Sequence, residues 1–184
     1  MTRPPRGFSP TEFERRTIRA QQLMMEQRLD ALFLCTEPEV RYFSGFLTQF
    51  WESPTRPWYL VVPLEGKPIA IIPEIGQSGM EATWIEDIRT WSAPQPGDDG
   101  LSLLKQAFSE MPYRFGQIGT QLGHESYLRM PINDFQELQI FHQFKDSTPL
   151  LRTLRNIKSK EEISKIRFIC QLTSDSFETL PNSL

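Results

Sequence analysis

The sequence contains few of the side chains that bind transition metals, with only two histidines and two cysteines among 184 residues. Neither His124 nor His142 has a second ligand at metal-binding spacing, and the patterns HExxH, CxxC and DxDxDG are absent. The nucleophile-elbow pattern GxSxG and the dinucleotide-binding pattern GxGxxG are also absent. We therefore expect no metal ligand and no catalytic residue in these 184 residues.

Strong charge and long apolar runs are also missing. The formal net charge is −3 without any Lys/Arg run, which argues against a nucleic-acid partner. No apolar run approaches the roughly 18 residues of a membrane-spanning helix, and the first ten residues lack the apolar segment of a secretion signal. Cys35 lies in an apolar run and Cys170 in a predicted helix, so we expect both thiols to be reduced and buried. These features predict a cytoplasmic protein without membrane partners.

Hydrophobic residues, by contrast, make up 39% of the sequence and include 13 phenylalanines, which suits the core of one domain. Short apolar runs, and at residues 85–91 an alternation of apolar and charged residues, predict strands, while amphipathic segments predict helices. The strands are predicted at residues 30–36, 58–63, 68–73, 85–91, 115–120 and 144–146, and helices at residues 9–28, 40–43, 74–83, 99–111 and 130–141. A hairpin turn at residues 64–67 requires an antiparallel pair. The pattern therefore predicts a three-layer α/β domain with a mixed sheet.

Helix-capping patterns occur near both ends of the chain. Ser9 precedes a proline and lies three residues before a glutamate, which predicts a helix start after a loose arm at residues 1–8. Ser159 and Glu162 form a second capping box. Apolar or small residues then recur every three or four positions, at Ile163, Ile166, Cys170, Thr173, Phe177 and Leu180. Such a face needs a partner, so we interpret residues 157–184 as a linker helix toward a following domain.

Residues 50–58 form the most conspicuous candidate binding loop, since they combine Phe50, Trp51, Arg56 and Trp58 with two prolines. A guanidinium offers a planar fork for a carboxylate, and aromatic rings offer the walls of a binding site. The alternative is structural: the rings pack beneath the loop and Arg56 pairs with a nearby acid. Both interpretations stay open at this point.

Three segments together resemble the N-terminal domain of the creatinase/prolidase family, the pita-bread metallopeptidases. Residues 30–46, Asp-Ala-Leu-Phe-Leu-Cys-Thr-Glu-Pro-Glu-Val-Arg-Tyr-Phe-Ser-Gly-Phe, are similar to the family's Asp-Ala-Leu-Leu run and its later Tyr-hydrophobic-[Ser/Thr]-Gly-Phe. Residues 58–73 match its paired strands around a Gly turn, and residues 149–167 are similar to its Arg-x-hydrophobic-Lys-[Ser/Thr]-x-x-Glu linker. Two positions depart from the family: Glu39 replaces a frequent Asn, and residues 117–121 (Gln-Ile-Gly-Thr-Gln) replace a commoner Ile-Gly-[Ile/Leu/Val]-[Glu/Asp] pattern.

The resemblance implies a ribonuclease-H-like α/β domain, here residues 1–156, in front of a catalytic domain. That domain would hold two divalent metal ions (Mn, Co or Zn) on Asp, His and Glu ligands, and would cleave Xaa-Pro bonds as Xaa-Pro dipeptidases and aminopeptidase P-like hydrolases do. The present chain alone would be inactive and would serve dimerisation and substrate gating. Its partners would be its own catalytic domain, a second copy, and a small peptide or amide substrate. Arg56 would anchor a substrate carboxylate, with Phe50 and Trp51 as walls.

Two other functions stay open from the sequence. The following domain could be a creatinase-like or ectoine-derivative amidohydrolase instead of an Xaa-Pro peptidase. The chain could also be a free-standing binding or scaffold module that keeps the fold without chemistry. The reading frame after Leu184 separates these alternatives, because a catalytic domain would carry the metal ligands that this chain lacks.

Overall fold

The computed structural model describes residues 3–53 and 56–179. Its helices are α1 (Pro10–Gln27), α2 (Glu37–Ser44), α3 (Gln77–Glu81), α4 (Leu101–Glu110), α5 (Ile132–Phe141), α6 (Thr148–Asn156) and α7 (Lys160–Thr179), with short 3-10 helices η1 (Gln49–Glu52) and η2 (Glu74–Gly76). Its strands are β1 (Ala31–Leu34), β2 (Tyr59–Pro63), β3 (Ile69–Pro73), β4 (Asp87–Trp91), β5 (Gln117–Thr120) and β6 (Gln143–Asp146). Each strand predicted from the apolar runs is present at its expected place.

The six strands form one mixed sheet in the order β4-β3-β2-β1-β5-β6. Strand β2 is antiparallel to both of its neighbours, β1 and β3. The pairs β1–β5, β3–β4 and β5–β6 are parallel. The predicted hairpin joins β2 to β3 and supplies an antiparallel pair, so the α/β class with a mixed sheet is confirmed.

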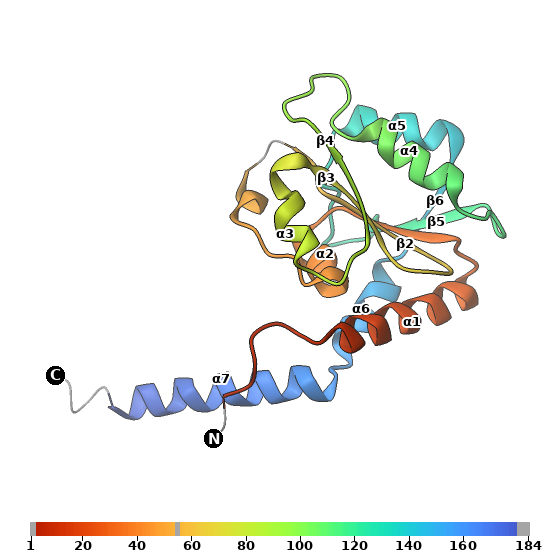
Figure 1. The fold of residues 1–184 in the computed structure, drawn as a ribbon. Helices are drawn as coiled ribbons and strands as arrows, with labels where there is room; N and C mark the ends of the chain where they lie inside the picture. Colours follow the sequence, from red (N-terminus) through yellow and green to blue (C-terminus); the bar gives the residue numbers. More distant parts are fainter. Residues whose placement is uncertain (1–2, 54–55, 180–184) are drawn as a thin grey trace.

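Helices cover both faces of this sheet, which gives three layers (Figure 1). Alternate residues of β1 point to opposite faces. Leu32 and Leu34 belong to the core shared with α1, α2 and α6, whereas Phe33 belongs to the core beneath α4 and α5. The Phe33 ring meets the Phe108 ring of α4 edge-on, with centroids 6.0 Å apart. Since both faces are buried, the central strand reads as a continuous apolar run.

Two glycines have structural roles set by close contacts. Gly45 ends α2 with φ +77°, and a Cβ atom there would lie 2.6 Å from the Phe13 ring. Gly76 separates η2 from α3, where a single helix over residues 74–83 was expected. A Cβ atom on Gly76 would lie 2.2 Å from the Trp58 ring, so the backbone can approach the ring only without a side chain.

Asp30, just before β1, ties together two segments that are distant in sequence. Its buried carboxylate accepts hydrogen bonds from four consecutive backbone N–H groups, those of residues 114–117, at 2.6–3.2 Å. The Asp30 N–H in turn donates to the Gln117 carbonyl at 2.8 Å. This clamp fixes the turn that leads into β5 beside β1, so the first residue of the Asp-Ala-Leu motif has a structural role.

Helix α7 extends away from the sheet domain, and none of its described residues is buried (Figure 1). The predicted capping box is confirmed, because the Glu162 N–H donates to Ser159 Oγ and the Ser159 N–H donates to Glu162 Oε2. Leu180 lies outside the described residues. The expectation that Cys170 is buried is wrong, because its helix lies outside the core; Cys35 is buried as expected, and both thiols are free. The boundary between residues 156 and 157, where α6 ends, stays a prediction.

The expectation of a loose N-terminal arm is wrong for its described residues 3–8, since they contact α7. The Lys165 ammonium donates to the Pro5 carbonyl and lies 4.9 Å from the centre of the Phe8 ring. Where the arm ends, α1 starts as predicted, with Ser9 Oγ accepting from the Glu12 N–H at 3.2 Å. Among the helices in the described part of the chain, none combines the length and apolar character needed to cross a membrane.

Candidate functional site

The aromatic loop predicted at residues 50–58 lies at the end of the sheet where β2 begins. Thr48 caps η1 by accepting from the Phe50 N–H at 3.3 Å. Trp51 is only 8% exposed, and its ring centroid lies 5.8 Å from that of Trp58. Phe50 is half-buried and stacks on Trp58 with an interplanar angle of 12°. The rings therefore form a packed base under the loop, and Phe50 offers more accessible surface than Trp51.

Arg56 adopts a left-handed backbone conformation, with φ +67°. Among residues 3–53 and 56–179, no carboxylate forms an ion pair with its guanidinium. The structure therefore does not place Arg56 in the acid pairing that was the structural alternative. Its role as a substrate anchor stays a prediction, as do the roles of Phe50 and Trp51. Residues 54–55 of the loop lie outside the described residues.

Arg129, which the sequence did not single out, holds this loop from behind. Its Nη1 donates to the Arg56 carbonyl at 2.8 Å, and its Nη2 donates to the Ser53 carbonyl. The guanidinium lies 5.3 Å from the centre of the Trp51 ring, within the range of a cation–π contact. Burial lowers the pKa of Arg129. No short-range pattern could reveal this residue, because it acts across more than seventy positions of sequence.

The backbone of Arg129 also contacts a core residue, Cys35. The Arg129 N–H donates to Cys35 Sγ at 3.2 Å. Burial raises the pKa of the Cys35 thiol to about 12, so the thiol stays protonated at neutral pH. Cys35 is thus a buried structural contact and lacks the thiolate that a nucleophile requires.

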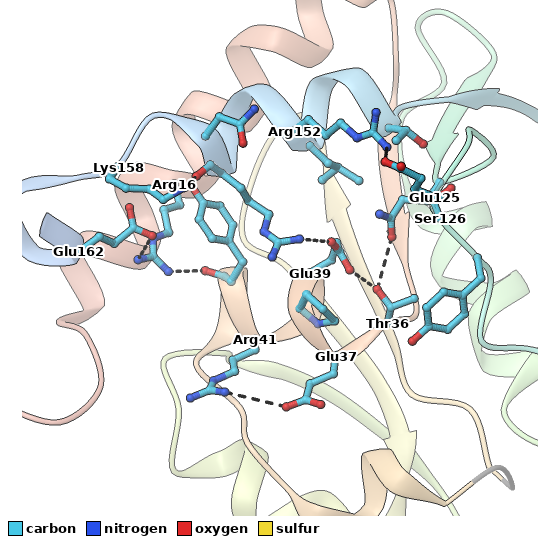
Figure 2. A pocket seen from close by; sticks show the side chains of 18 of the residues that line it. Arg16, Thr36, Glu37, Glu39, Arg41, Glu125, Ser126, Arg152, Lys158 and Glu162 are labelled. Atoms are coloured by element: carbon cyan, nitrogen blue, oxygen red, sulfur yellow. Dashed lines mark hydrogen bonds and ion pairs between the residues drawn. The ribbon is translucent and has the colours of Figure 1, made fainter. Parts of the chain in front are cut away.

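A separate charged cleft of about 830 Å³ lies between the N-terminal half of α2, the loop at residues 121–127 and α6 (Figure 2). Ion pairs cross it: Arg155 Nη1 lies 2.6 Å from Glu39 Oε1, and Arg152 Nη2 lies 3.3 Å from Glu125 Oε2. Figure 2 shows Glu125 and Arg152 on one side, and Arg16 and Glu162 on the other. The cleft offers charges of both signs, which suits a polar or zwitterionic surface better than an apolar ligand.

Glu39, where the family often has Asn, is a buried and paired carboxylate. Its carboxylate is 3% exposed and contacts both Arg155 and the Thr36 hydroxyl. A buried carboxylate needs a paired cation and hydrogen bonds, and these two neighbours provide them. Arg155 is the first residue of the linker motif, so Glu39 connects α2 to the other end of the domain.

No group of three or more His, Cys, Asp and Glu side chains could hold a metal ion within the part of the chain that the structure describes. His142 stacks on Tyr113 with centroids 5.7 Å apart and meets Phe108 edge-on, and burial lowers its pKa. The His124 carbonyl accepts a hydrogen bond from Arg152. The His142 ring is therefore a packed structural side chain, whereas His124 is exposed.

The fold and the cleft define an α/β domain with a polar, ion-paired cleft. Residues 16–157, well over half of the chain, match the family model of the Creatinase/Prolidase N-terminal domain. The chain therefore belongs to this family, and the resemblance drawn from its motifs is confirmed.

Relatives and solved structures agree with this assignment. The chain is 26% identical over 166 residues to an uncharacterized hydrolase/peptidase of Sinorhizobium fredii, covering 87% of this chain and 42% of that protein. A dipeptidase from Pyrococcus horikoshii has the same fold, with a TM-score of 0.69 and 17% identity, covering 91% of this chain and 44% of that one. The creatinase/prolidase N-terminal domain of an X-Pro dipeptidase from Streptococcus pyogenes gives a TM-score of 0.57 at 15% identity, covering 79% and 99%. The chain spans less than half of the length of the curated relatives it matches.

Proposed function

We propose that this domain is the non-catalytic N-terminal part of a dinuclear metallopeptidase of the Xaa-Pro dipeptidase or aminopeptidase P type. It mediates dimerisation and controls the entry of substrate into a separate catalytic domain. The observation that carries the proposal is the family match over residues 16–157, in a chain that spans less than half of the length of relatives named as peptidases. The solved neighbours named as dipeptidases support the same class of reaction.

The metal centre belongs to the proposed catalytic domain. Residues 3–53 and 56–179 do not fit a dinuclear site, since they contain no three-ligand group. Two divalent ions (Mn, Co or Zn) would supply Lewis-acid activation there. The role we propose for the present domain is to bind and orient the substrate and to exclude water, while the chemical step belongs to the catalytic domain.

Substrate gating is assigned to the aromatic loop. Arg56 supplies a guanidinium without a carboxylate partner among the described residues, and a guanidinium binds a carboxylate with two parallel hydrogen bonds. Phe50, half-buried on Trp58, forms the wall beside it, and Trp51, only 8% exposed, supports that wall from beneath. Arg129 keeps the main chain of the loop in place, so the anchor is presented on a supported segment.

Replacing Arg56 tests the gating role in the full-length protein. Arg56→Ala should raise KM for an Xaa-Pro dipeptide such as Ala-Pro, assayed with Mn²⁺, because a charge-assisted contact contributes on the order of 1.5–3 kcal/mol. Arg114→Ala is a matched control, since Arg114 is an exposed arginine at the opposite end of the sheet, beside the start of β5. Unchanged KM in Arg56→Ala would remove the anchor from the proposal.

Two further experiments test the non-catalytic role and the dimerisation role, the first of them with the 184-residue chain. It should show no Xaa-Pro hydrolysis with Mn²⁺, Co²⁺ or Zn²⁺, and metal-dependent turnover by this chain alone would contradict its non-catalytic role. Sedimentation velocity over a range of concentrations should give a dimer for the full-length protein. A monomer at all concentrations would contradict the dimerisation role and leave the gating role to the Arg56 experiment.

A further inference from the structure

Arg16 of α1 is a buried arginine whose guanidinium connects the sheet domain to α7. The side chain is 5% exposed, and all three of its nitrogens donate hydrogen bonds. Nε donates to Glu12 Oε1 at 3.1 Å, Nη1 donates to the Tyr42 carbonyl at 2.8 Å, and Nη2 donates to Glu162 Oε1 at 3.2 Å. Figure 2 shows Arg16 and Glu162 facing each other at one end of the cleft.

Aromatic rings enclose the same guanidinium. Arg16 Cζ lies 4.2 Å from the centre of the Phe8 ring and 4.4 Å from that of Tyr42. Phe8 comes from the N-terminal arm and Tyr42 from α2. Arg16 therefore joins four segments, the arm, α1, α2 and α7, through charge-assisted hydrogen bonds and cation–π contacts.

Glu162 has two functions at the start of α7, one for each carboxylate oxygen. Oε2 accepts from the Ser159 N–H at 2.8 Å and completes the capping box. Oε1 accepts from Arg16. The cap fixes this carboxylate relative to the first turn of α7, and Arg16 fixes it relative to the sheet domain. Glu162 therefore connects the start of α7 directly to the sheet domain.

The remaining contacts of α7 are also polar and lie in its first two turns. Ser9 Oγ donates to Glu161 Oε1 at 3.3 Å, Arg15 lies 3.6 Å from Glu161, and Lys165 contacts the arm. Ile166, at the end of the second turn, is exposed, as are Ile169, Leu172 and Phe177 farther along the helix. Since no described residue of α7 is buried, hydrophobic packing cannot set its orientation.

We propose that Arg16 and Glu162 form an ionic joint, closed by Phe8 of the N-terminal arm, that fixes the angle between α7 and the sheet domain. Arg16 is a positioning residue in this arrangement: it determines where the apolar face of α7 points. The proposal does not depend on the reaction of the full-length protein. Glu12 is 2% exposed and stays paired with Arg16 when Glu162 is lost, so the joint can open without leaving a buried charge unpaired.

Spin labelling of the 184-residue chain can measure this angle. Cys170 is exposed on α7, whereas Cys35 is buried and protonated, so a thiol label attaches to Cys170 without removal of the second cysteine. Ser109→Cys adds a second label on the exposed face of α4. Double electron–electron resonance then gives the distance distribution between α7 and the sheet domain. The unmodified joint should give one narrow distribution.

Three substitutions open the joint in different ways. Glu162→Gln keeps the cap, because glutamine also serves in capping boxes, but weakens the pairing with Arg16. Arg16→Gln removes the central guanidinium, and Phe8→Ala removes the ring from the arm. Each should shift and broaden the distance distribution, most for Arg16→Gln and least for Phe8→Ala, while circular dichroism at 222 nm keeps its amplitude.

Two controls separate the joint from general effects. Ser159→Ala removes the serine side of the cap but keeps the Arg16–Glu162 contact, so the centre of the distribution should stay in place. Arg41→Gln breaks an arginine–glutamate pair on the surface of α2 and should change nothing. If Glu162→Gln and Phe8→Ala both give the wild-type distribution, the proposal is wrong, whether or not Arg16→Gln folds. A broad distribution in the unmodified protein would also overturn it.

Discussion

The sheet domain and α7 are stabilised by different kinds of interaction. In the sheet domain, every residue of β1 and β2 is buried, and helices cover both faces. In α7, no described residue is buried, and its first two turns make polar contacts with the rest of the chain. Burial of apolar area stabilises the sheet domain, whereas a few charged groups fix the position of α7.

The two regions should therefore respond differently to substitution. Substitutions in the sheet domain should change the free energy of unfolding, because they create cavities or leave buried polar groups unpaired. Substitutions on the outer face of α7 should leave that free energy almost unchanged.

Asp30→Ala should have the largest effect within the sheet domain. The substitution leaves four backbone N–H groups without their acceptor, and we expect a loss of about 4 kcal/mol, roughly 1 kcal/mol for each N–H. Urea unfolding monitored by tryptophan fluorescence measures the change. Asp30→Asn keeps one carbonyl oxygen as an acceptor and should lose less. Equal stability of Asp30→Ala and wild type would show that the clamp is not needed.

A matched pair of apolar truncations compares the two regions directly. Leu150→Ala in α6 removes a buried side chain and should cost about 2–5 kcal/mol. Ile166→Ala in α7 removes a side chain that is 46% exposed and should change the unfolding free energy by less than about 0.5 kcal/mol. A similar loss in both variants would mean that α7 is part of the cooperative core.

The sequence predicted the sheet domain well because local patterns encode it. All six strands follow from short apolar or alternating segments, and both serine caps follow from their spacing to a glutamate. It did not reveal Asp30, Arg129 or Arg16 as structural centres. Each of these acts on groups that are 26–146 positions away, and only the fold brings those groups together.

The candidate site was predicted only in part. The loop at residues 50–58 was found from its composition, and the choice between packing rings and binding rings needed the positions of Trp51 and Phe50. The charged cleft had no sequence signal, since its walls come from α2, α6 and a loop far apart in the chain. Burial of Cys170 was predicted wrongly, because helical periodicity shows an apolar face without showing what covers it.

Gly76→Ala tests a close contact inside the sheet domain. The added methyl would lie 2.2 Å from the Trp58 ring, and such overpacking costs about 1–3 kcal/mol. Trp58→Phe removes the ring atoms that the methyl meets, so the glycine substitution should cost less in that background. The double-mutant cycle, measured by urea unfolding, should give a clear coupling energy. If the effects of Gly76→Ala and Trp58→Phe are additive, the cost of the added methyl does not come from contact with the Trp58 ring.

The smallest expected effect is a pH dependence at His142. Burial lowers the pKa of this histidine, so its neutral form is favoured in the folded state. In the unfolded chain the pKa is about 6.5. The stabilising contribution is therefore complete above pH 6.5 or so and is lost as the pH falls toward the lower, folded-state pKa, because the unfolded chain takes up the proton first.

Comparison with His142→Gln isolates this contribution. The variant loses stacking on Tyr113 at every pH, and that loss does not change with protonation of residue 142. Wild type should therefore lose more stability than His142→Gln between pH 7.5 and pH 5.5, as measured by urea midpoints at each pH. The same pH dependence in both proteins would mean that folding does not lower the pKa of His142.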